Sequence, residues 1–119
     1  MSYPKRAAIE LLKLALIVFA TGFPASSNAL DIVGAASCGD WVKDRADKGR
    51  NKVAGESWLV GYLSGIAIDS NKNFLKDKDV NLFYLWMDDY CKNSPLSNTA
   101  VGGRRLSMEL IKKMPYWLK

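Results

Sequence analysis

The hydrophobic pattern of the chain is strongest between residues 56 and 69, where the sequence reads ESWLVGYLSGIAID. Apolar residues recur there at the spacing of one face of an α-helix. They are Trp58, Leu59, Tyr62, Leu63 and Ile66. The pattern predicts a helix over about 56–68 with one buried side, and we expect it to be the central helix of a small bundle.

Two glycines, Gly61 and Gly65, lie inside the same pattern. A glycine in a helix interior costs about 1 kcal/mol relative to alanine. We expect close approach by another helix at these two positions to offset that cost.

Two further helices are predicted on either side of the central one. Ser37 and Asp40 are suited to the start of a helix over about 38–48, and Gly49 is suited to its end. Asp79 is suited to cap a helix over 80–91, which Pro95 limits on its far side. In the first, Trp41, Val42 and Ala46 are expected to face inward. In the second, one broad face is formed by Leu82, Leu85, Trp86, Asp89 and Tyr90, with Phe83 and Met87 beside it.

A fourth helix is predicted to start at Ser97 or Asn98, to reach residue 113 and to stop at Pro115. Gly102 and Gly103 are expected to weaken its first half. Its predicted inward residues are Val101, Leu106, Leu110 and Ile111.

The segments between these helices are polar. Residues 50–55 are predicted to form a turn, and residues 69–78 a charged loop that places Phe74 in the core. The tail 116–118 is expected to fold back on the core, with a partner anchor as the alternative. No run alternates with a two-residue period, so the sequence predicts an all-α fold, a small four-helix bundle.

The first 29 residues have the layout of a secretory signal peptide. Lys5 and Arg6 precede an uncharged apolar run over 14–23, and small residues lie before residue 30. The run is about ten residues long, shorter than the roughly 20 that a membrane-spanning helix needs. We therefore expect residues 1–29 to be removed, leaving one domain over 30–119 without a stable membrane span and located in the periplasm. Cleavage after Ala25 and an uncleaved anchor are the alternatives.

The chain has two cysteines, Cys38 and Cys91, and an exported chain allows them one pairing. Their disulfide would enclose 52 intervening residues and, in the chain-entropy model, stabilise the fold by about 4 kcal/mol. A domain of about 90 residues has a modest core, so such a crosslink would contribute a large share of its stability.

Candidate chemistry is sparse, because the chain has no histidine. This removes the commonest general base and metal ligand. Asp88 and Asp89 form the only tight carboxylate pair, but adjacent helical residues diverge by about 100° and do not converge on a substrate. We expect one to be exposed and the other to accept hydrogen bonds. The sequence therefore predicts a protein that is not an enzyme and uses no cofactor or metal.

Charge and aromatic content do not change this interpretation. The formal charge of +5 falls to +3 without residues 1–29, and the remaining basic residues alternate with acidic ones. This pattern favours a solvated surface over nucleic-acid binding. The aromatic residues at helical spacing are expected to be core residues rather than a ligand box. They are Trp41, Trp58, Tyr62, Trp86 and Tyr90.

Four motifs together resemble a family of small exported bacterial helical proteins. They are CGDW at 38–41, WLVGYLSG at 58–65, WMDDYC at 86–91 and NSPL at 93–96. The family includes immunity proteins of the Rap/Tai kind, which neutralise cell-wall amidases delivered by type VI secretion, and is more loosely similar to the HdeA acid-stress chaperones. The resemblance covers about 37–110 and consists largely of core and disulfide residues.

The resemblance implies a periplasmic binding protein that blocks a peptidoglycan-cleaving toxin, such as a secreted amidase, by occlusion. In such immunity proteins a variable loop makes the inhibitory contact, and homodimers are common. By position, the corresponding loop here is 69–79. Its candidate partner-binding residues are Asp69, Asn71, Lys72, Asn73, Lys76 and Asp77. An acid-stress chaperone and a cell-envelope hydrolase are the alternative functions.

Overall fold

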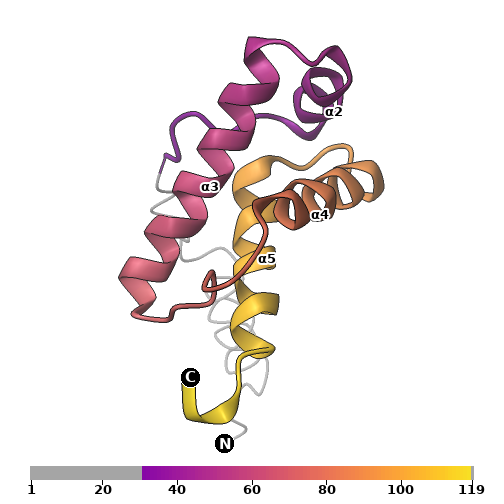
Figure 1. The fold of residues 1–119 in the computed structure, drawn as a ribbon. Coiled ribbons are helices and arrows are strands. Elements are labelled where there is room, and N and C mark those ends of the chain that lie inside the picture. The colour runs from indigo at the N-terminus through magenta and orange to yellow at the C-terminus, as the bar shows by residue number, and fades with distance from the viewer. Residues whose placement is uncertain (1–30, 119) are drawn as a thin grey trace, which may run out of the picture. The chain divides into compact units, whose positions relative to one another are not determined.

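The computed structural model describes residues 31–118, which form four α-helices and a short 3₁₀-helix (Figure 1). The helices are α2 (Cys38–Asp47), α3 (Arg50–Ser70), α4 (Val80–Asn93), α5 (Thr99–Lys112) and η1 (Tyr116–Leu118). Across 31–118 the only β-type pairing is an isolated bridge between Ser37 and Asn98. The all-α prediction is confirmed. The predicted signal peptide, residues 1–29, lies outside the described residues.

Three helices begin at capping side chains that the sequence indicates. Ser37 Oγ accepts a hydrogen bond from the Asp40 backbone N–H at 3.0 Å. Asp79 caps α4 in the same way, and Asn98 rather than Ser97 caps α5. Each cap satisfies an N–H group that the first helical turn leaves without a partner.

Helix α3 is longer than predicted, because the expected turn over 50–55 is helical. The chain changes direction between α2 and α3 within only two residues. Lys48 adopts left-handed backbone angles with φ of 54°, and Gly49 is extended. The polar composition of 50–55 reflects a solvated first stretch of helix. Gly55 lies beside the Trp41 ring, where an added Cβ would be in ordinary contact at 3.5 Å.

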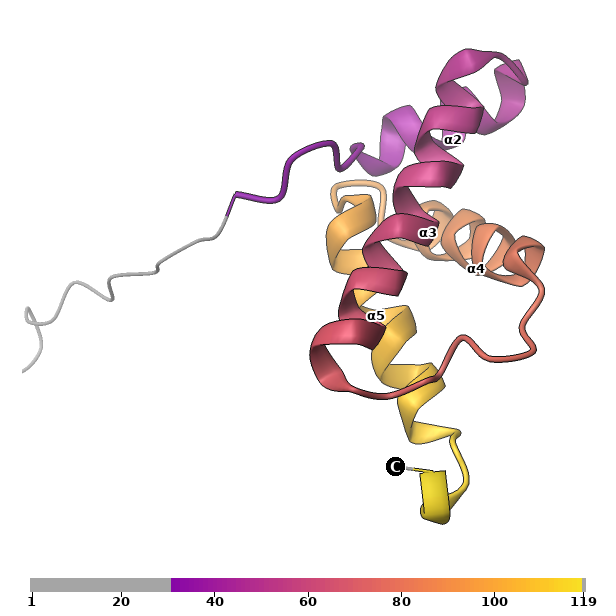
Figure 2. The ribbon, with the colours of Figure 1, turned by 60° about the vertical axis from the view of Figure 1, so that its left-hand side comes forward.

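The helices pack around a core to which each of them contributes. Helices α3 and α5 run side by side, and α4 lies across them (Figure 2). Helix α2 packs on α3 and α4. The central buried residues are Cys38, Trp41, Leu59, Leu63, Phe74, Phe83, Met87, Cys91 and Leu106. Phe74 reaches this core from the loop after α3, as predicted.

The buried face of α4 differs from the predicted one. Leu82 and Leu85 belong to the broad face that the sequence indicates, but they are 57% and 59% exposed. The buried residues are Phe83, Met87 and Cys91, which are one turn apart. The disulfide explains the difference, because turning Cys91 toward α2 turns Phe83 and Met87 inward with it.

Three other predicted inward residues, Val42, Ala46 and Val101, are also exposed. In α2 only Cys38 and Trp41 are buried, since a ten-residue helix at the end of the bundle presents a narrow face to it. In α5 the buried positions beside Val101 are Ala100 and Gly102.

The helix-contact glycines are in α5 and not in α3. A Cβ atom added at Gly61 or Gly65 would meet nothing within 4 Å, so the prediction of close approach there is wrong. A Cβ added at Gly102 would lie 2.6 Å from Met87 Sδ, and one at Gly103 would lie 2.8 Å from Tyr62 Cδ1. Both glycines lie in regular helix. Because they lack a Cβ, Gly102 lets α4 and Gly103 lets α3 pack closely against α5.

Candidate functional site

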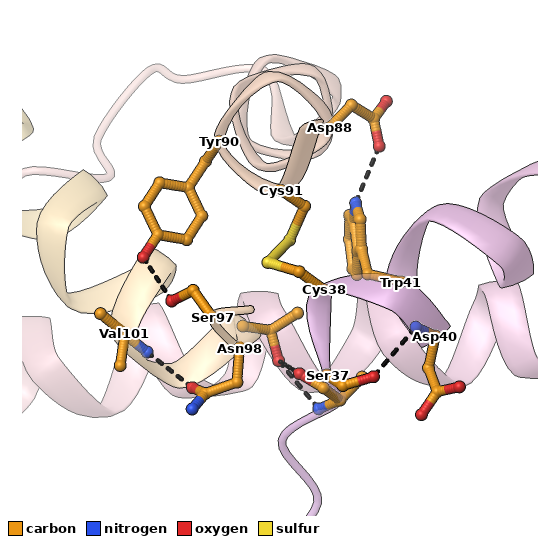
Figure 3. The surroundings of a disulfide bond; sticks show 12 residues. Ser37, Cys38, Asp40, Trp41, Asp88, Tyr90, Cys91, Ser97, Asn98 and Val101 are labelled. Carbon is orange, nitrogen blue, oxygen red and sulfur yellow. Dashed lines mark hydrogen bonds between the residues drawn. A yellow bond between two sulfur atoms is a disulfide. The ribbon is translucent and has the colours of Figure 1, made fainter. Parts of the chain in front are cut away.

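The disulfide between Cys38 and Cys91 joins the start of α2 to the end of α4 (Figure 3). The two Cα atoms are 4.8 Å apart, and both residues are buried. This separation lies within the usual range for a disulfide, about 4.4–6.8 Å. The predicted pairing is confirmed.

Backbone hydrogen bonds fasten two more segments beside the disulfide. The Cys38 N–H donates to Ser97 O, and the Thr99 N–H donates to Ala36 O, both at 2.9 Å. The Tyr90 hydroxyl lies 2.6 Å from Ser97 Oγ, as Figure 3 shows. The segment before α2 and the turn before α5 are thus held at the same end of the bundle.

An ionic cluster centred on Arg45 connects α2, α3 and α4. Arg45 donates through Nε and Nη2 to the two carboxylate oxygens of Asp88, each at 2.8 Å, and also binds Glu56. Trp41 Nε1 donates to Asp88 at 2.8 Å. The guanidinium also lies over the rings of Trp41 and Tyr84. Asp88 is therefore occupied by structural hydrogen bonds, while Asp89 is exposed, as expected for this pair.

The surroundings shift two pKa values in this cluster. Hydrogen bonding to Asp88 is the main cause that raises the pKa of Arg45, so its charge is kept. Burial raises the pKa of Tyr84, with a smaller contribution from the negative charge of Glu56. Because the folded-state pKa of Tyr84 is raised, the stability linked to it is complete below about pH 10 and is lost as the pH rises through that pKa. The stability linked to Arg45 is lost only at still higher pH. The cluster functions as a structural clamp between helices.

Replacing Asp88 with asparagine should lower the free energy of unfolding by about 1 kcal/mol. An asparagine retains an acceptor for Trp41 but removes the charge that pairs with Arg45. The expected loss is well below that of a fully buried ion pair, because solvent screens this partly exposed site. Urea unfolding measures the loss. Asp89→Asn is the matched control and should change stability by less than about 0.5 kcal/mol; equal effects of the two changes would contradict the assignment.

The five predicted core aromatics pack differently from one another. Trp41 is buried, whereas the other four are partly exposed. Trp58 stacks on Tyr62, and Trp86 stacks on Tyr90, with ring centroids 4.9 Å and 5.4 Å apart. The Trp58 indole N–H donates to Val33 O, and that of Trp86 donates to Glu109. These contacts place the aromatic pairs at the edges of the core.

The loop between α3 and α4 carries most of the candidate partner-binding residues. Asp69 lies in the last turn of α3, and the other five follow that helix. Phe74 anchors the loop in the core, while Asn73, Lys76 and Asp77 are exposed on either side of it. Asn71 and Asp77 adopt left-handed angles, with φ of 51° and 58°. Asparagine and aspartate tolerate this conformation better than most residues, so the local sequence fits the loop shape.

A hollow of about 470 Å³ lies between this loop and the end of α5. Its apolar lining is made by Phe74, Leu110, Met114, Pro115 and Leu118. Its polar lining is made by Asn71, Asn73, Lys76, Asp77, Lys78 and Lys113. We call residues 71–79 and 110–118 together the loop–tail surface. The sequence indicated the loop half of it but not the part contributed by α5 and the tail.

The tail of this surface does not fold onto the core as expected. Tyr116 and Trp117 are 89% and 82% exposed. Pro115 lies between the end of α5 at Lys112 and the start of η1 at Tyr116, while Phe74 occupies the core at this end. Two large aromatic side chains are therefore presented to solvent beside the hollow.

The described chain is an all-α domain with a single disulfide and a loop–tail surface at one end. No family model matches the sequence, and no curated protein or solved structure matches it either. Within 31–118 no helix is both long enough and apolar enough to cross a membrane. The same residues contain no group of three or more Cys, Asp or Glu placed to hold a metal ion.

Proposed function

We propose that this protein is a non-enzymatic periplasmic binding protein that recognises another protein through the loop–tail surface. Its most concrete form is an immunity protein that blocks a peptidoglycan-cleaving toxin by occlusion. The observation that carries the proposal is a hollow with an apolar floor that the candidate loop and the tail both line, the tail through Pro115 and Leu118. Between these two residues, Tyr116 and Trp117 are exposed.

The side chains on this surface are those that contribute most to protein–protein binding. Tryptophan and tyrosine are enriched among interface residues with large energetic effects. Trp117 and Tyr116 are exposed without a partner among residues 31–118 that covers them. An interface of standard size buries about 800 Å² on each partner, so it would extend from the tail across the loop.

The anchoring of the loop supports binding without a large entropic cost. Phe74 fixes the middle of the loop in the core, and the backbone of Lys72 donates to Ala67 O at 3.1 Å. A loop already held in one conformation loses less freedom when a partner binds. An occluding inhibitor needs this property, because it must remain in the enzyme cleft without being processed.

The proposal is tested with secreted cell-wall amidases, beginning with any that a neighbouring gene encodes. The oxidised protein should form a stable complex with the amidase and stop its hydrolysis of peptidoglycan. The double change Tyr116→Ala and Trp117→Ala should weaken the complex by at least about 30-fold, since aromatic residues of this kind contribute about 2 kcal/mol or more at interfaces. Calorimetry and a peptidoglycan-release assay measure the two effects.

Leu96→Ala is the matched control for this experiment. Leu96 is fully exposed in the turn before α5, whereas the tail follows the other end of that helix. The 14 residues of α5 separate the two sites by roughly 20 Å. The control should bind as the unmodified protein does. Full amidase activity in the presence of excess protein would remove the immunity proposal.

A further inference from the structure

We infer that the hollow of the loop–tail surface binds an acidic segment of a protein partner, with one apolar side chain of that segment inserted between the loop and α5. The inference rests on the proposed function and specifies the chemistry of the partner.

The floor of the hollow is suited to an apolar side chain. Leu110, Met114 and Leu118 follow one another at four-residue spacing from α5 into the tail, and Phe74 faces them from the loop. A volume of about 470 Å³ falls within the usual range of ligand sites, roughly 300–1,000 Å³. An apolar group placed there would remove this lining from water.

The rim of the hollow is suited to negative charge. Lys76, Lys78 and Lys113 line it, and Asp77 is its only carboxylate. Among residues 31–118, none of these three lysines lies within 4.0 Å of a carboxylate oxygen. The nearby Asp79 caps α4, where it accepts from the Asn81 backbone N–H and side chain. Unpaired lysines around an apolar floor are complementary to a partner that is acidic and carries an apolar side chain.

A second basic hollow, between α2 and α4, is less suited to an acidic segment that carries an apolar side chain. Its lining includes Arg45, Lys48, Lys52 and Lys92. Arg45 is already paired with Asp88 and Glu56, and Lys52 lies 3.5 Å from Glu56. Lys48 and Lys92 have no such partner among residues 31–118, so positive charge remains at both hollows. The apolar lining between α2 and α4 is limited to Val42 and Ala46, however, so this hollow offers little floor for an apolar side chain.

A concave floor also favours a protein segment over an anionic membrane. Proteins that lie on membranes insert a protruding apolar face below the headgroups. Here the apolar lining is recessed between the loop and α5, where a side chain reaches it more readily than a flat lipid surface does.

The test uses the oxidised full chain and a blocked pentapeptide with one phenylalanine between two pairs of aspartates. Amide ¹H–¹⁵N shifts are recorded during titration. We expect shifts confined to 71–79 and 110–118, and none with a peptide in which lysines replace the aspartates. Raising the salt from about 0.01 M to about 1 M should weaken binding several-fold, because the screening length falls from about 30 Å to about 3 Å.

Two variants with opposite expected effects make the test sharper. Lys76→Glu combined with Lys113→Glu should abolish the shifts, while Lys43→Glu, an exposed change on α2, should leave them unchanged. Asp77→Asn should strengthen binding by about two- to threefold, since it removes the acidic group from the rim. Asparagine keeps the left-handed backbone, so this variant should fold normally.

Several outcomes would overturn the inference. These are equal shifts with both peptides, unchanged binding by the charge-reversed variant, or a blue shift of Trp117 emission with phosphatidylglycerol vesicles but no response to the acidic peptide. Amidase inhibition that survives Lys76→Glu with Lys113→Glu would leave the proposed function intact and reject the inference alone. Peptide binding without any amidase complex would reject the proposed immunity function and leave the chemistry inferred for the hollow intact.

Discussion

Reducing the bond between Cys38 and Cys91 should lower the free energy of unfolding by about 4 kcal/mol. The two residues are 53 positions apart in the chain, and the crosslink restricts the unfolded chain in proportion to the logarithm of that loop. A typical domain has a net stability of about 5–15 kcal/mol. The reduced protein should therefore remain only marginally folded.

The measurement compares urea unfolding of the oxidised and reduced protein with that of a Cys38→Ala and Cys91→Ala double variant. In a parallel thermal unfolding experiment the midpoint temperature should fall by about 15–30 °C on reduction, given about 4–8 °C per kcal/mol for a domain of this size. The double variant should behave like the reduced protein with a small additional loss from the missing sulfur atoms. This comparison separates the crosslink from the packing of the two side chains.

An unchanged midpoint after complete reduction would contradict this prediction. It would mean that the hydrogen bonds from Cys38 to Ser97 and from Thr99 to Ala36 already hold this end of the bundle in both states. Such a bond persists in an oxidising compartment, which agrees with the proposed periplasmic location.

Local signals in the sequence predict the helices well, because they depend on nearby residues. Ser37, Asp79 and Asn98 each satisfy a backbone donor two or three positions ahead, and this needs no tertiary information. The disulfide was predictable for a different reason, since two cysteines allow one pairing. These two kinds of signal define the all-α fold.

The orientation of each helix was harder to predict, because it depends on what the neighbouring helices supply. The pattern of α4 offers two apolar faces, one with Leu82 and Leu85 and another with Phe83 and Met87. Hydrophobicity alone does not decide which face is buried. Cys91 lies on the face with Phe83 and Met87, so the disulfide turns that face toward the core. The exposure of Leu82 and Leu85 is the result.

The candidate site was only half predictable for a similar reason. Charge and asparagine content identify residues 69–78 as a loop, but the hollow also needs Leu110 at the end of α5 and Met114 just after that helix, about 35 positions later. The exposed tail follows from Phe74 occupying this end of the core, which is a tertiary fact. No periodic signal distinguishes an aromatic tail that docks from one that remains in solvent.

The glycines of α5 and α3 provide the second large prediction, since equal changes should have opposite effects. Gly102→Ala should lower the free energy of unfolding by about 1–2 kcal/mol. The new Cβ would lie 2.6 Å from Met87 Sδ and 2.7 Å from Tyr90 Cδ1. Met87 is fully buried, and Tyr90 is held by its stacking on Trp86 and by Ser97. Overpacking of about 1–3 kcal/mol therefore exceeds the gain in helix propensity.

Gly61→Ala in α3 is the matched change, and it should raise the free energy of unfolding by about 0.5–1 kcal/mol. The new methyl group meets nothing within 4 Å, so only the helix propensity and the reduced freedom of the unfolded chain contribute. Chemical unfolding of both variants, with the disulfide intact, measures the two changes. If Gly61→Ala also destabilises the protein, the exposed face of α3 must contact something that residues 31–118 do not include. If Gly102→Ala is neutral, Met87 can move aside, and the close packing of α4 on α5 does not require glycine.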